Sequence, residues 1–141
     1  MRFLTSPPRY LFFTGKGGVG KTSIASATAV ALATPTCRVL LVSTDPASNI
    51  AQVFGVTIGN TITPVPEVPG LDALEIDPEQ AADAYRNSII DPVRDLLPAP
   101  EIAAITEQLS GSCTTEVAAF NEFTALLTND AAYQRYDHII F

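Results

Sequence analysis

The chain has 141 residues, a size that suits one domain, and 47% of them are apolar. Its formal net charge is −7, and eight Lys and Arg residues scattered among fifteen acidic ones do not form the basic surface that nucleic-acid binding requires. Two widely spaced cysteines exclude a disulfide scaffold, and no apolar run reaches the roughly 18 residues of a membrane-spanning helix. The composition therefore predicts a reduced, cytosolic protein without nucleic acid as a partner.

The predicted elements begin with a strand, a helix and a second strand. We expect strands at 10–14, 38–44, 71–76 and 138–141, and helices at 21–33, 47–55, 78–97, 101–109 and 113–127. The first helix consists of small residues, so we expect it to be buried on most sides. Pro92 is expected to kink or divide the helix over 78–97. This order is typical of an α/β fold with a mainly parallel sheet and flanking helices.

The helix expected over 113–127 is amphipathic. It places Val117, Phe120, Phe123 and Leu127 on one face. The chain then ends on the buried-strand pattern of 138–141, where a domain rarely stops. We therefore interpret residues 1–141 as the N-terminal part of one α/β domain, truncated at a core strand.

A glycine-rich loop follows the first strand. Its sequence "GKGGVGKT", from Gly15 to Thr22, fits the phosphate-loop pattern G-x-x-x-x-G-K-[ST] without a mismatch. Bare backbone N–H groups and the N-terminus of the next helix suit a triphosphate, which identifies a P-loop NTPase fold. The expected nucleotide-binding residues are Gly15, Lys16, Gly17, Gly18, Val19, Gly20, Lys21, Thr22 and Ser23. Lys21 would hold the β- and γ-phosphates of ATP, and the Thr22 hydroxyl would ligate Mg²⁺.

Two more residues are singled out by their position. Asp45 follows the second strand at the edge of the sheet where ligands gather, so it could activate the attacking water or bind Mg²⁺ through a water. An ordinary Asx-turn or helix cap before Pro46 is the alternative. Cys113 stands at the start of a predicted helix, which favours a thiolate, and thiolates suit soft metalloids. A small buried hydrophobic residue is the alternative for Cys113.

The segments "GKGGVGKT", "LLVSTDPASN" and "LSGSCTTEVAAFNEF" resemble those of the arsenical pump-driving ATPases, and the resemblance runs along essentially the whole chain. It implies that Lys16 acts on the nucleotide of a second ATPase half or subunit, as an arginine finger does. It also implies that Asp45 activates water and that Cys113 binds arsenite or antimonite. Family members continue after the last strand into "DTAPTGHT", so the resemblance implies that the present chain stops before a catalytic aspartate.

The resemblance thus implies an ATP- and Mg²⁺-dependent catalytic subunit, activated by arsenite or antimonite. The implied partners are a membrane-embedded arsenite efflux subunit, a second ATPase half and a metallochaperone. The implied location is cytoplasmic and peripheral at the inner membrane. Two alternatives stay open, namely an ATPase that targets tail-anchored membrane proteins and a truncated nucleotide-binding module without activity.

Overall fold

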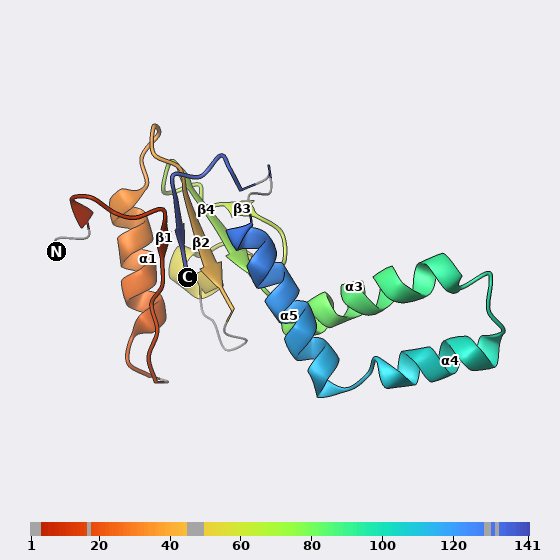
Figure 1. Ribbon diagram of the computed structural model, residues 1–141. Helices are drawn as coiled ribbons and strands as arrows, with labels where there is room; N and C mark the ends of the chain where they lie inside the picture. Colours follow the sequence, from red (N-terminus) through yellow and green to blue (C-terminus); the bar gives the residue numbers. More distant parts are fainter. Residues whose placement is uncertain (1–3, 17, 45–49, 129–130, 132) are drawn as a thin grey trace. The chain divides into compact units, whose positions relative to one another are not determined.

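The computed structural model describes residues 4–16, 18–44, 50–128, 131 and 133–141 (Figure 1). The chain forms two compact units. The sheet unit contains residues 1–76 and 129–141, and the helical unit contains residues 77–128.

Among the described residues, the sheet unit has five strands in the order β1-β5-β2-β4-β3. The strands are β1 (Tyr10–Leu11), β2 (Val39–Ser43), β3 (Thr63–Pro64), β4 (Leu71–Glu75) and β5 (His138–Ile140). All neighbouring pairs are parallel except β3 with β4. The mainly parallel α/β sheet predicted from the sequence is therefore confirmed, including the strand at the end of the chain.

The first strand is shorter than predicted. Only Tyr10 and Leu11 are strand residues, although the Phe13 N–H still donates to the Phe141 carbonyl at 2.7 Å. Beside this last hydrogen bond, the rings of Phe12 and Phe141 stack at a centroid separation of 4.8 Å. The ladder between these two chain segments thus continues beyond the formal strand, and it keeps Phe13 next to the glycine loop.

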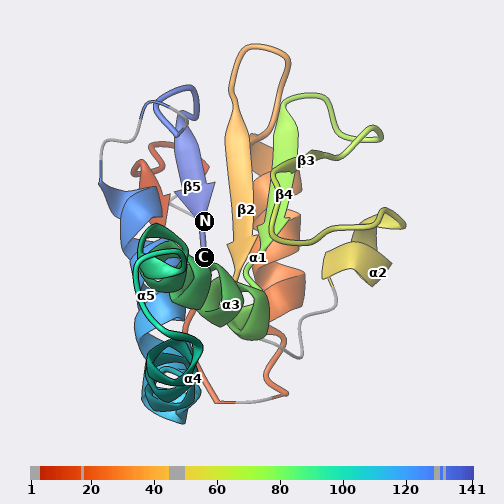
Figure 2. The same cartoon turned by 90° about the vertical axis from the view of Figure 1, so that its right-hand side faces the viewer.

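Helices α1 (Lys21–Leu32) and α2 (Ile50–Phe54) belong to the sheet unit. Helix α1 lies along one face of the sheet, as Figure 2 shows. Its buried residues Ala25 and Ala29 join the core formed with Val39 and Leu41 of β2. The expectation that α1 is buried on most sides is wrong, because Ile24 and Val30 are 48% and 43% exposed. In the described part of the sheet unit, α1 packs against the sheet and against α2, and the rest of its surface is open.

A buried carboxylate joins the amino ends of three strands. Asp72 in β4 is 4% exposed, and it accepts hydrogen bonds from Arg38 Nη2 at 2.6 Å and from Tyr136 Oη at 2.5 Å. Arg38 immediately precedes β2 and Tyr136 lies just before β5. The Arg38 guanidinium also lies over the Tyr136 ring, 5.7 Å from its centroid. The charge of Asp72 is thus compensated, as a buried carboxylate requires.

Gly70 forms the turn that leads into β4. Its φ of +90° lies in the region that side chains disfavour, and its carbonyl accepts a hydrogen bond from Val39 N at 2.8 Å. A Cβ at this position would lie 2.0 Å from the Thr34 carbonyl oxygen. Both the backbone conformation and the neighbouring chain therefore require glycine here.

The helical unit contains α3 (Pro78–Ile90), the 3-10 helix η2 (Asp91–Val93), α4 (Ala99–Gln108) and α5 (Ser112–Leu127). The Asp77 side chain caps α3 by accepting hydrogen bonds from the N–H groups of Glu79 and Gln80. Helix α3 ends before Pro92, as predicted, because proline cannot continue its hydrogen bonds. Its buried residues Ala81 and Ala82 pack with Ala118 of α5. No helix in the described residues is long and apolar enough to cross a bilayer.

Gly70→Ala should lower the free energy of unfolding by about 2–5 kcal/mol, because the new methyl group combines a strained φ with a backbone clash. Gly59→Ala is the matched control, since no atom lies within 4 Å of the added carbon there. Urea unfolding followed by circular dichroism measures both variants. Equal stability of the two would contradict the structural requirement for Gly70.

The stability of the sheet unit should fall as the pH rises from about 10 to about 12. Burial and the hydrogen bond to Asp72 raise the pKa of Tyr136 to about 12, so the folded protein keeps a proton that the unfolded chain releases near pH 10. The stabilisation is complete below pH 10 and is lost above it. Tyr136→Phe should flatten this alkaline decline. Absorbance titration at the tyrosinate band should show that one of the four tyrosines titrates late.

Candidate functional site

The glycine loop lies at the carboxyl edge of the parallel sheet, between β1 and α1. Gly20 is the N-cap of α1 with φ +85°, and Gly18 has φ +75°. Both conformations are easily adopted only by glycine. The loop can therefore turn sharply into the helix while its N–H groups stay free of side-chain cover.

The N-terminus of α1 suits an anion. The first turn contains no acidic residue, and the cap residue has no side chain to occupy the free N–H groups. The helix dipole adds positive potential at the same place. An anionic group at this end would therefore meet unoccupied donors and no repelling carboxylate from the helix.

Lys21 and Lys16 have different positions in the loop. The Lys21 ammonium folds back over the loop and donates to the Lys16 carbonyl oxygen at 3.2 Å. The Lys16 residue itself is exposed. Lys21 thus places its charge inside the curve of the loop, whereas Lys16 lies on the open surface of the sheet unit.

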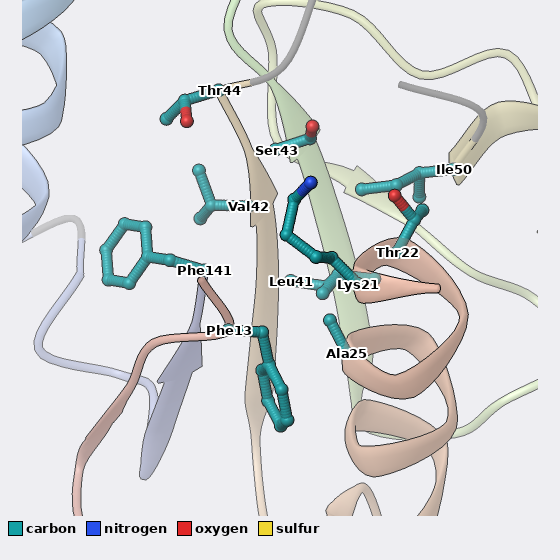
Figure 3. A pocket seen from close by; sticks show the side chains of 10 residues that line it. All are labelled: Phe13, Lys21, Thr22, Ala25, Leu41, Val42, Ser43, Thr44, Ile50 and Phe141. Atoms are coloured by element: carbon teal, nitrogen blue, oxygen red, sulfur yellow. The ribbon is translucent and has the colours of Figure 1, made fainter. Parts of the chain in front are cut away.

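A cavity of about 90 Å³ adjoins Lys21 and the carboxyl end of β2. Figure 3 shows the Lys21 side chain extending from the start of α1 toward Ser43. The residues that line the cavity are Phe13, Lys21, Thr22, Ala25, Leu41, Val42, Ser43, Thr44, Ile50 and Phe141. The wall therefore combines one ammonium group and three hydroxyl groups with an apolar base.

The structure brings some of the predicted site residues together and not others. The structure brings Lys21 and Thr22 together at the cavity, and it places Gly15, Gly18, Val19, Gly20 and Ser23 around the same loop. Gly17 and Asp45 lie outside the described residues. Cys113 is the second residue of α5, exposed, in the helical unit. Cys113 is not among the residues that line the cavity.

Ser43 and Thr44 are site residues that the sequence analysis did not select. They could have been selected by the rule that ligands bind at the carboxyl ends of parallel strands, since both lie at the end of β2. Phe13 and Phe141 were also missed, because their place in the wall depends on the hydrogen bond between them, which lies just beyond β1 and β5. Pairing of distant segments is not visible in a local pattern.

Hydroxyl oxygens at the cavity are hard ligands that suit Mg²⁺. Within the described residues, no group of three or more His, Cys, Asp and Glu side chains could hold a metal ion. The hydroxyl groups present would therefore suit a magnesium ion, which Thr22 would help to hold.

Comparisons with known proteins identify the family. The model of the anion-transporting ATPase family matches residues 8–141. An arsenical pump-driving ATPase of Acidiphilium multivorum and one of Escherichia coli are each 64% identical over all 141 residues, and the chain spans 24% of their length. An ATPase GET3 of Meyerozyma guilliermondii is 41% identical over 98 residues. The matched region covers 63% of the chain and 28% of that relative. The chain therefore belongs to the anion-transporting ATPase family.

Proposed function

We propose that this chain is the ATP-binding part of an ATPase that drives arsenite or antimonite efflux. The observation that carries the proposal is the glycine loop, in which Lys21 lies over the curve of the backbone at an uncapped helix N-terminus. The 64% identity to arsenical pump-driving ATPases supports the transported substrate, and the lower identity to ATPase GET3 makes a targeting ATPase the weaker alternative.

The nucleotide is held by the loop from Gly15 to Ser23. The N–H groups of the loop and of the first turn of α1 bind the phosphates, and Lys21 compensates their charge. Thr22 holds Mg²⁺, which neutralises phosphate charge when it is bound with the nucleotide. Breaking the hydrogen bond between Lys21 and the Lys16 carbonyl frees the ammonium group for the phosphates.

Hydrolysis needs groups beyond this loop. Asp45, two residues after β2 in the sequence, orients the attacking water. Lys16 is exposed and serves the nucleotide of a second ATPase half or subunit, where its charge stabilises the transition state. Because the chain spans about a quarter of the length of its relatives, this second half belongs to the longer protein.

The activating ligand is arsenite or antimonite. Cys113 supplies one thiolate from the exposed start of α5. The longer protein works in the cytoplasm, peripheral to the inner membrane, on a membrane-embedded efflux subunit, and a metallochaperone delivers the metalloid. An efflux subunit is the partner that an ATPase driving an arsenical pump would require.

The two loop lysines should contribute unequally to the binding of Mg²⁺-ATP by the 141-residue chain. Lys21→Ala should weaken binding of Mg²⁺-ATP by about 10-fold or more, because charge-assisted hydrogen bonds contribute about 1.5–3 kcal/mol. Lys16→Ala removes the same charge and should weaken binding much less. Isothermal titration calorimetry measures both affinities.

The comparison of the two variants distinguishes a specific contact of Lys21 with the nucleotide from a general effect of positive charge. Equal losses in the two variants would mean that the loop attracts the nucleotide only through its net charge. In the full-length protein, Lys16→Ala should remove most stimulated turnover. Normal turnover there would contradict the role of Lys16 at a second site.

Cys113→Ser in the full-length protein should abolish most of the stimulation of ATP hydrolysis by antimonite, because a hydroxyl is a poor ligand for a soft metalloid. Phosphate release with and without antimonite measures the effect. Cys37→Ser is the control, since Cys37 is half-buried beside the Thr34 bridge and has no proposed role. Stimulation that survives in Cys113→Ser would remove Cys113 from the metalloid site.

A further inference from the structure

Glu75 ends strand β4 at the same edge of the sheet as the phosphate loop. Its register partner is Ser43, the last residue of β2, which lines the cavity together with Lys21 and Thr22 (Figure 3). Of the four described strands that run in this direction, only β4 ends on an acidic residue. The sheet thus places one carboxylate a single strand away from the wall of the cavity.

The Glu75 side chain belongs to the face of the sheet that α1 covers. Successive residues of a strand point to opposite faces. Leu71 and Ala73 of β4 lie in one core with residues of α1, and Glu75 is the next position in this alternation. Ser43 continues the same alternation in β2, after two residues of that core. Glu75 and Ser43 are therefore neighbours on the face that carries the phosphate loop.

Backbone hydrogen bonds hold Glu75 in this register. The Glu75 N–H donates to the Gly59 carbonyl at 3.0 Å, and the N–H of the buried Ile76 donates to the Ser43 carbonyl at 2.8 Å. The end of β4 is thus tied to the chain on both of its sides. The position of the carboxylate follows from strand pairing and does not depend on an open surface.

The Glu75 carboxylate has no partner in the described part of the chain. Glu75 is half-buried, and its side chain forms no hydrogen bond or ion pair with the described residues. Asp72 in the same strand is paired with Arg38 and Tyr136. Because a carboxylate removed from water is costly without donors, Glu75 is suited to accept hydrogen bonds from a ligand.

The unit around Glu75 has no excess of either charge. Residues 77–128 contain nine acidic side chains and two arginines, so the helical unit alone has the formal net charge of −7. The sheet unit has six acidic and six basic side chains. Within a unit of balanced charge, local groups such as Lys21 and Glu75 determine which anion the cavity favours.

We propose that Glu75 is a positioning residue that makes the site select the magnesium complex of ATP over ATP without metal. This role of Glu75 rests on the nucleotide site proposed above. A carboxylate repels bare phosphate oxygens, whereas it accepts hydrogen bonds from water bound to Mg²⁺. Protein-bound Mg²⁺ keeps several of its waters, so a carboxylate one strand away acts through them without ligating the ion.

Isothermal titration calorimetry with the 141-residue chain tests this selectivity. ATP is titrated once with excess Mg²⁺ and once with EDTA, and the ratio of the two dissociation constants measures the preference for the magnesium complex. Glu75→Gln keeps the size of the side chain and removes its charge. It should lower the preference at least about tenfold, because the charge-assisted hydrogen bonds and the repulsion of metal-free ATP are both lost.

Two further variants separate the contact from its alternatives. Glu75→Asp keeps the charge and should retain more of the preference than Glu75→Gln does. Glu67→Gln removes the same charge at an exposed position of the sheet unit and should leave the preference unchanged. A merely structural role of Glu75 would weaken the binding of both forms of ATP alike, so it would not move the ratio.

Two results would overturn this role of Glu75. A ratio that stays the same in Glu75→Gln, whether or not both affinities fall, would mean that the carboxylate does not act on the hydrated ion. An equal fall in Glu67→Gln would assign the preference to net charge. A wild-type chain that binds ATP in neither condition would instead contradict the proposed nucleotide site itself, and this failure differs from an unchanged ratio in a chain that binds.

Discussion

The hydrogen-bonded carboxylate of Asp72 sets the frame on which the sheet unit depends. It binds Arg38 before β2 and Tyr136 before β5, so three parallel strands start at a common level. A buried charge is costly unless its partners are held in place, and this requirement makes the pairing register specific. Because the strands run parallel from this level, their carboxyl ends lie on the same side of the sheet, which brings Ser43 at the end of β2 and Phe141 after β5 to one edge.

The candidate site is a consequence of that common edge. Helix α1 starts there, after Gly20, which has a positive φ and no side chain that could cover the helix N-terminus. The Lys21 side chain bends over the loop toward the Lys16 carbonyl, so its positive charge lies near the backbone N–H groups of the loop. The amino edge thus stabilises the unit through charge compensation, and the opposite edge carries an ammonium group and hydroxyl groups that can receive a ligand.

The sequence predicts the elements that depend on local patterns. The glycine loop, the buried strand β2, the break at Pro92 and the last strand are all found where periodicity and turn residues indicate them. The two-residue length of β1, the burial of Asp72 and the cavity wall at Phe13 and Phe141 depend on contacts between distant segments. The exposure of Ile24 and Phe120 was missed for a related reason, since periodicity identifies an apolar face but not whether a neighbour covers it.

The unequal charge of the two units gives the chain an electric asymmetry. Carboxylates gathered in residues 77–128, beside a unit of balanced charge, make the chain an electric dipole in addition to an anion. In the field of a cationic protein such a molecule experiences a torque as well as an attraction, and it rotates during diffusion until its acidic helices lead. The phosphate loop belongs to the unit without net charge, so the attraction that a nucleotide meets there comes from local groups such as Lys21 and the N-terminus of α1.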